Sequence, residues 1–119
     1  MTVKECYDAM GANYEDVFGR LRKDERIQKF LLKLLNDQSF ALLCSSIEGR
    51  DMAEAFRAAH TLKGVCQNLS LTRLYESSSE MSELLRNRQE YGEDLEPMLE
   101  RVREDYESTV NCIRQLEEA

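Results

Sequence analysis

The chain has 119 residues, of which 42% are hydrophobic and 33% are charged, and its formal net charge is −7. This length and balance predict one globular domain, residues 1–119, with a single hydrophobic core. An acidic surface argues against nucleic acid or anionic lipid as a partner. No apolar run approaches the roughly 18 residues of a membrane span, and no secretion signal is evident, so we expect a cytoplasmic protein.

The four cysteines lie far apart in the sequence, at Cys6, Cys44, Cys66 and Cys112. No pair has the C-x-x-C spacing that is typical of metal ligands or redox motifs. We therefore expect them to be reduced thiols that fill the core, and we expect no metal site.

The single proline and five glycines leave long stretches without helix breakers, which favours an all-α fold of five or six helices. Thr2 is a suitable N-cap for a short helix that ends near Gly11, and Asn13 is suitable for a second one. A stronger helix is predicted to begin at Asp24. The polar stretch 36–39 predicts a break or kink, so the next apolar segment is either a new helix or a continuation. That segment ends at a glycine and contains Phe40, Leu43, Cys44 and Ile47.

A central helix is predicted to begin at Asp51, where Glu54 completes the spacing of a capping box. Apolar residues at helical spacing predict its core face: Met52, Phe56, Ala59, Leu62, Cys66 and Leu69. Ser70 is a candidate N-cap for the following helix. The inner face of that helix is predicted to contain Leu71, Leu74, Ser78, Met81 and Leu85. Because the connection is so short, the two helices should pack antiparallel.

A last helix is predicted from Leu95, with Pro97 tolerated in its first turn. Roughly 24 residues at 1.5 Å per residue give it a length of about 36 Å. Together these segments predict an antiparallel four-helix bundle with one or two short N-terminal helices that cover one end. We expect a monomer, because one bundle can bury its own apolar faces.

A second stripe on the central helix is displaced from the core face toward solvent. It contains Ala53, Arg57, His60, Lys63, Gly64 and Gln67. His60, the only histidine of the chain, is therefore expected to be exposed, with Lys63 one turn onward on the same side. Glycine in a helix interior lowers stability by about 0.5–1 kcal/mol relative to alanine, so Gly64 suggests that space is needed beside the imidazole.

This arrangement suits phosphoryl transfer. An ordinary histidine has a pKa of about 6.5, so a neutral imidazole is available as a nucleophile toward phosphorus. Lys63 is placed to stabilise the added negative charge. The sequence contains no glycine-rich phosphate loop and no kinase-like nucleotide motif. We therefore expect a phosphocarrier rather than a true enzyme, without ATP-dependent kinase activity.

The segment Ala58-Ala59-His60-Thr61-Leu62-Lys63-Gly64 resembles the H-x-x-K-G signature of the histidine phosphotransfer family of two-component phosphorelays. The resemblance covers roughly residues 26–86. It implies that His60 is the phosphoacceptor and that Lys63 and Gly64 occupy the neighbouring family positions. It also implies response-regulator receiver domains or hybrid sensor kinases as partners, with Mg²⁺ supplied by the receiver and no cofactor held by this chain.

Two positions depart from the family pattern. Ser70 stands where a glycine is common, and Ser82 stands where some members have a longer polar side chain that reaches the imidazole. Arg57, Gln67 and Ser82 are nevertheless candidate partner contacts.

Two other functions are considered for such a bundle. A helical adaptor would bind signalling partners without phosphotransfer, but it has no need of His60, Lys63 and Gly64 together. A carboxylate di-iron site requires Glu-x-x-His pairs, and the sequence contains none.

Overall fold

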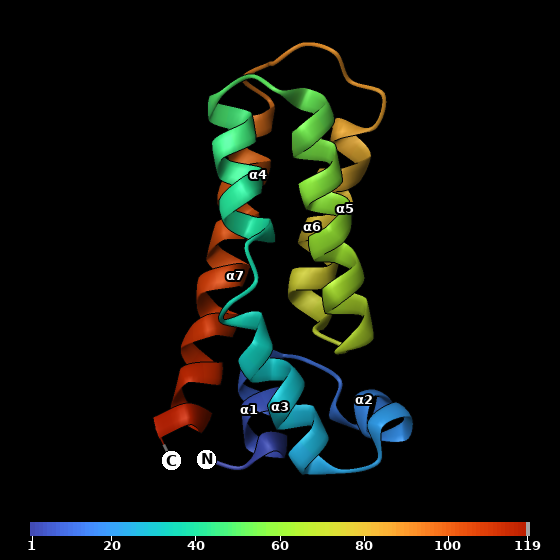
Figure 1. Ribbon diagram of the computed structural model, residues 1–119, viewed down its shortest axis with the longest axis vertical. Helices are drawn as coiled ribbons and strands as arrows, with labels where there is room; N and C mark the ends of the chain where they lie inside the picture. The colour runs from blue at the N-terminus through green and yellow to red at the C-terminus, as the bar shows by residue number, and fades with distance from the viewer. Residues whose placement is uncertain (119) are drawn as a thin grey trace.

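The computed structural model describes residues 1–118, with side chains described for residues 1–116, and this part of the chain contains helices and no strand (Figure 1). The helices are α1 (Val3–Met10), α2 (Tyr14–Leu21), α3 (Asp24–Leu34), α4 (Ser39–Glu48), α5 (Met52–Asn68), α6 (Thr72–Leu85) and α7 (Leu95–Glu118). The all-α prediction is confirmed. The described helices number seven, rather than five or six, because the chain is interrupted between α3 and α4.

The predicted ends of the first two helices are confirmed. Thr2 and Glu5 form a reciprocal capping box at the start of α1, and Gly11 ends that helix in the left-handed conformation, with φ of 64°. The Asn13 side chain accepts a hydrogen bond from the Asp16 amide at the start of α2. These ends were predictable because every partner lies within four residues of the cap.

The helices of the second half lie side by side in pairs (Figure 1). Helix α5 packs on both α4 and α6, and α6 packs on α7. The turns at 49–51 and 69–71 are short, so the chain reverses direction between α4, α5 and α6. Helix α7 extends along the full height of the molecule, and its C-terminal half packs against α1 and α3. The first three helices thus cover the end of the molecule where α5 terminates.

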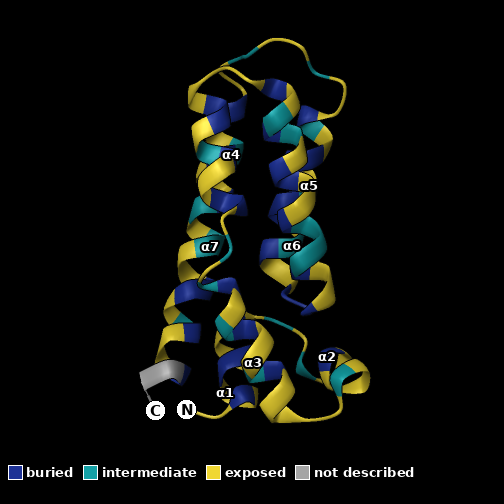
Figure 2. Ribbon diagram, viewed as in Figure 1, coloured by how far each residue is buried: buried dark blue, intermediate teal, exposed yellow. Residues whose placement is uncertain are grey.

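The core lies between these helices, and exposed residues occupy their outer faces (Figure 2). The predicted core face of α5 is buried with one exception, Phe56, which is only half-buried. Phe18 and Phe30 also remain 39% and 40% exposed. None of the described helices is both long and apolar enough to cross a membrane.

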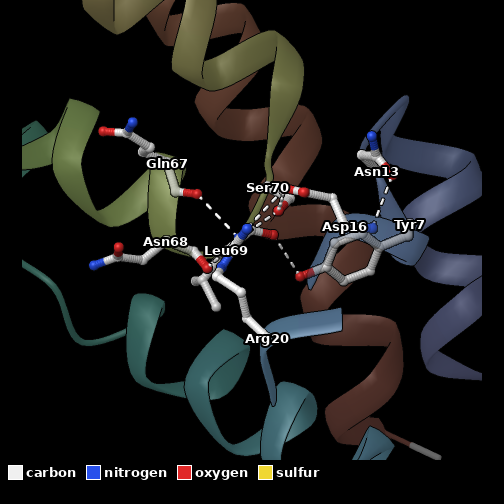
Figure 3. A network of polar contacts seen from close by, with 8 residues as sticks. All are labelled: Tyr7, Asn13, Asp16, Arg20, Gln67, Asn68, Leu69 and Ser70. Atoms are coloured by element: carbon white, nitrogen blue, oxygen red, sulfur yellow. Dashed lines mark hydrogen bonds and ion pairs between the residues drawn. The ribbon is translucent and has the colours of Figure 1, made fainter. Parts of the chain in front are cut away.

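The C-terminal end of α5 is fastened to the N-terminal helices by hydrogen bonds (Figure 3). Arg20 Nη2 of α2 donates to the carbonyl oxygens of Gln67 at 3.2 Å and Asn68 at 2.8 Å, and to Ser70 Oγ at 2.5 Å. The Tyr7 hydroxyl of α1 donates to the Leu69 carbonyl at 2.7 Å. These bonds satisfy carbonyls that a helix leaves without partners at its C-terminus. They fix the end of the helix that bears His60.

The prediction that Ser70 is the N-cap of α6 is wrong. The N-cap is Leu71, and no side chain caps that position. Ser70 has φ of 55°, and its hydroxyl donates to Asp16 Oδ2 at 2.6 Å. The left-handed backbone turns the chain from α5 into α6, and this explains why glycine suits the position. The serine hydroxyl is used for contact with α2 instead of capping.

Candidate functional site

His60 lies near the middle of α5 and is exposed. On the opposite side of the helix, Ala58, Ala59 and Leu62 are buried against the neighbouring helices. The predicted division of α5 into a core face and a solvent-facing stripe is therefore confirmed at His60. The imidazole is available to a group that approaches from outside the protein.

The imidazole stacks on Phe56, one turn earlier in the helix. The two ring centroids are 5.8 Å apart, and the ring planes make an angle of 22°. Helical side chains lie over the turn on their N-terminal side, so residues at i and i−4 meet. The His60 ring consequently leans toward Phe56 and away from Gly64.

Gly64 leaves bare backbone on the other side of the imidazole. A Cβ atom added there would meet nothing within 4 Å apart from the backbone of its own helix, among the residues that the structure describes. A methyl group at position 64 would therefore not crowd the imidazole. Contacts within the protein therefore do not require glycine at this position. The open space beside Gly64 is available to a group that approaches His60 from outside.

Lys63 is half-buried, and its charge acts on Glu83 of α6, the helix that packs against α5. On α6, Glu83 is within electrostatic reach of Lys63 and forms an ion pair with Arg86 at 2.9 Å. Hydrogen bonds from Arg86 lower the pKa of the Glu83 carboxyl, and the charge of Lys63 lowers it further. The Arg86 guanidinium also lies 5.3 Å from the centroid of the Phe56 ring. Two cations and one carboxylate therefore lie together where α5 meets α6, next to the Phe56 ring that stacks on His60.

The three candidate partner contacts have different surroundings. Arg57 is exposed one turn before His60 and forms an ion pair with Glu54. Gln67 is exposed two turns after His60, in the same stripe. Ser82, by contrast, is fully buried, and its hydroxyl has no hydrogen-bond partner among the described residues. The prediction of Ser82 as a partner contact is corrected on this ground, because a docked protein cannot touch a side chain without accessible surface.

Sequence inspection missed Phe56, Glu83 and Arg86 as neighbours of the site. For Phe56 a signal existed, because it precedes His60 by four residues and so belongs to the same helical row. Glu83 and Arg86 lie on another helix, more than 20 residues along the chain, and nothing in their local spacing links them to His60.

His60 is the only histidine of the chain. The site therefore has one imidazole nucleophile and no second histidine that could act as its base. An exposed imidazole with adjacent cations can accept an activated phosphoryl group, whereas generating one from a nucleotide requires a phosphate-binding loop and metal ligands. The described residues contain no group of three or more His, Cys, Asp or Glu side chains that could hold a metal ion.

Neither the curated proteins nor the solved structures contain a match to this chain. Among protein families, the Hpt domain matches residues 25–117. The matched region begins in the first turn of α3 and includes α4, α5 and α6 in full and nearly all of α7, while α1 and α2 precede it. It contains His60, Lys63 and Gly64. The chain therefore belongs to the Hpt domain family, whose members transfer phosphoryl groups through a histidine in phosphorelays.

Proposed function

We propose that this domain is a phosphorelay intermediate, which accepts a phosphoryl group on His60 from the aspartyl phosphate of one receiver domain and passes it to the aspartate of another. The observation that supports this most directly is the surface around His60. The imidazole is exposed, it is inclined toward Phe56, and the backbone at Gly64 is open on its other side. This geometry leaves room for a receiver to bring its aspartyl phosphate in line with a ring nitrogen.

In the accepting step, the unprotonated ring nitrogen of His60 attacks phosphorus. A nitrogen–phosphorus bond forms as the bond between phosphorus and the aspartyl oxygen breaks, and the aspartate leaves as a carboxylate. The other ring nitrogen keeps its proton. The second receiver reverses these events with its own carboxylate, so neither step requires ATP or an oxidant. Lys63 neutralises part of the phosphoryl charge throughout.

The receiver supplies Mg²⁺ in this proposal, and His60 and Lys63 are the contribution of this chain. The domain acts as a monomer in the cytoplasm, and α4, α5, α6 and α7 serve as an antiparallel four-helix bundle that presents the imidazole. Arg57 and Gln67 flank His60 on the exposed stripe and are proposed to contact the receiver. The α1–α2 pair takes no part in the chemistry.

A relay with two receivers tests this function. One receiver is phosphorylated with acetyl phosphate, freed of excess reagent and mixed with this domain and a second receiver. We expect phosphate to reach the second receiver only when the domain is present, and His60→Gln to abolish transfer while the helical content is unchanged. Lys63→Ala should slow transfer, whereas Lys29→Ala, at an exposed position on α3 outside the stripe, should not. Binding of a receiver without phosphate movement would instead indicate an adaptor.

A further inference from the structure

Three side chains, Glu83, Arg86 and Phe56, connect helix α6 to the imidazole of His60. Glu83 forms an ion pair with Arg86 at 2.9 Å, the Arg86 guanidinium lies 5.3 Å from the Phe56 ring centroid, and that ring stacks on His60 at 5.8 Å. The first distance is typical of an ion pair, the second of a cation–π contact and the third of an offset aromatic stack. No other aromatic ring of the described residues stacks on His60.

We propose that Phe56 is a positioning residue for phosphoryl transfer, which holds the His60 imidazole in the orientation that a receiver needs, and that Arg86 holds Phe56 in turn. This inference rests on the proposed function of His60. Phe56 itself does not touch the reacting atoms.

The stack restrains the imidazole without blocking its nitrogens. The lone pair of a ring nitrogen lies in the plane of the ring, whereas the 22° stacking angle brings a face of the imidazole toward Phe56. An exposed histidine otherwise samples several side-chain rotamers, and only some of them place a nitrogen in line with the phosphorus. Phe56 therefore raises the fraction of docked complexes in which a ring nitrogen is in line with the phosphorus.

Arg86 extends the restraint to a second helix. Phe56 is half-buried, so packing alone does not enclose its ring. Arg86, at the C-terminal end of α6, is itself held by Glu83 one turn earlier in its helix. The orientation of the imidazole thus depends on the packing of α5 against α6 as well as on its own helix.

The test compares Phe56→Leu and Phe56→Tyr with Phe30→Leu. Phe30 is a matched control, because it is 40% exposed on α3 and has a cation, Lys33, 5.1 Å from its ring centroid, but it does not stack on the histidine. An aromatic pair contributes about 0.5–1.5 kcal/mol, so Phe56→Leu should lower the transfer rate at saturating receiver by about two- to tenfold. The receiver concentration at half-saturation should stay unchanged. Phe56→Tyr should retain the wild-type rate, and Arg86→Gln should give an intermediate loss.

NMR spectroscopy reports directly on the contact between the His60 and Phe56 rings. Since His60 is the only histidine, its imidazole protons give one set of NMR signals. Phe56→Leu should remove the ring-current shift of those signals, whereas Phe30→Leu should leave them in place. The proposal is overturned if Phe56→Leu behaves like Phe30→Leu in both measurements, or if it changes only the half-saturation concentration. A wild-type domain that accepts no phosphate would overturn the proposed function instead.

Discussion

Arg20 and Ser70, which are separated by 50 positions in the chain, are joined by a hydrogen bond of 2.5 Å between Nη2 and Oγ. Asp16 completes a triangle with them, because its Oδ2 accepts from Ser70 Oγ at 2.6 Å and pairs with Arg20 Nη1 at 2.8 Å. The triangle connects α2, which precedes the region matched to the Hpt family, to the turn that follows the histidine helix. The triangle thus fastens α2 to the turn between α5 and α6.

Loss of the Arg20 side chain should destabilise this junction. Arg20→Ala removes hydrogen bonds to two helix-terminal carbonyls and one hydroxyl, but the side chain is partly exposed, so we expect the free energy of unfolding to fall by only about 1 kcal/mol. Arg26→Ala is the control, because Arg26 is exposed and has no ion pair or side-chain hydrogen bond among the described residues. Urea unfolding of both variants measures the difference. Equal stability of the two would show that the junction contributes nothing.

The parts of the fold that were predictable are those whose causes are local. Thr2, Asn13 and Asp51 accept hydrogen bonds from amides three residues onward, so their sequence neighbours alone predicted the helix starts. The role of Ser70 was not predictable, because its partners Asp16 and Arg20 meet it only through tertiary packing.

The same distinction applies to the site. The exposure of His60 follows from helical periodicity around the buried Leu62, and the prediction was confirmed. The burial of Ser82 was also available from periodicity, since it follows Ser78 by four residues on a face predicted to be internal. The cation–π contact between Arg86 and Phe56 joins two helices, and no spacing within either one predicts it.

The buried hydroxyl of Ser82 should lower stability. It has no hydrogen-bond partner among the described residues, and an unsatisfied buried polar group costs about 1–3 kcal/mol. Ser82→Ala should therefore raise the free energy of unfolding by about 1 kcal/mol without changing phosphotransfer. Ser78→Ala is the matched control, because Ser78 is equally buried but donates to the Leu74 carbonyl at 2.6 Å. Chemical denaturation should show no gain for Ser78→Ala, and a loss of stability in Ser82→Ala would contradict this view of the hydroxyl.

Replacement of Gly64 should separate stability from function. Gly64→Ala should raise the free energy of unfolding by about 0.5–1 kcal/mol, because alanine favours helix and the added methyl meets no other part of the described chain. Gly64→Leu should gain stability for the same reason, yet it should slow transfer from a receiver at least tenfold by occupying the docking space. Gly19→Ala provides the control, since Gly19 lies in α2 with equally open surroundings. A Gly64→Leu variant that transfers at the wild-type rate would contradict the steric argument.

Alkaline pH should weaken the fold through Cys6. Burial raises the pKa of the Cys6 thiol to about 11 from an ordinary value near 9, and neighbouring Cys112 adds to the shift. Between these values the unfolded chain loses the thiol proton while the folded chain keeps it, so stability falls as pH rises from about 9 to about 11. Urea unfolding at pH 7 and pH 10 should show this decrease, and it should be smaller in Cys6→Ala. An identical pH dependence in both proteins would exclude Cys6 as a source.

Locating the phosphoryl group tests the proposed role of His60 most directly. The domain is incubated with a phosphorylated receiver, separated from it under alkaline conditions and examined by ³¹P NMR and by peptide mapping at neutral to alkaline pH. If His60 is the phosphoacceptor, we expect one phosphoramidate signal that is stable in alkali and lost in acid, on the peptide that contains His60. A phosphoryl group on any other residue, or a folded domain that binds the phosphorylated receiver and acquires none, would contradict it.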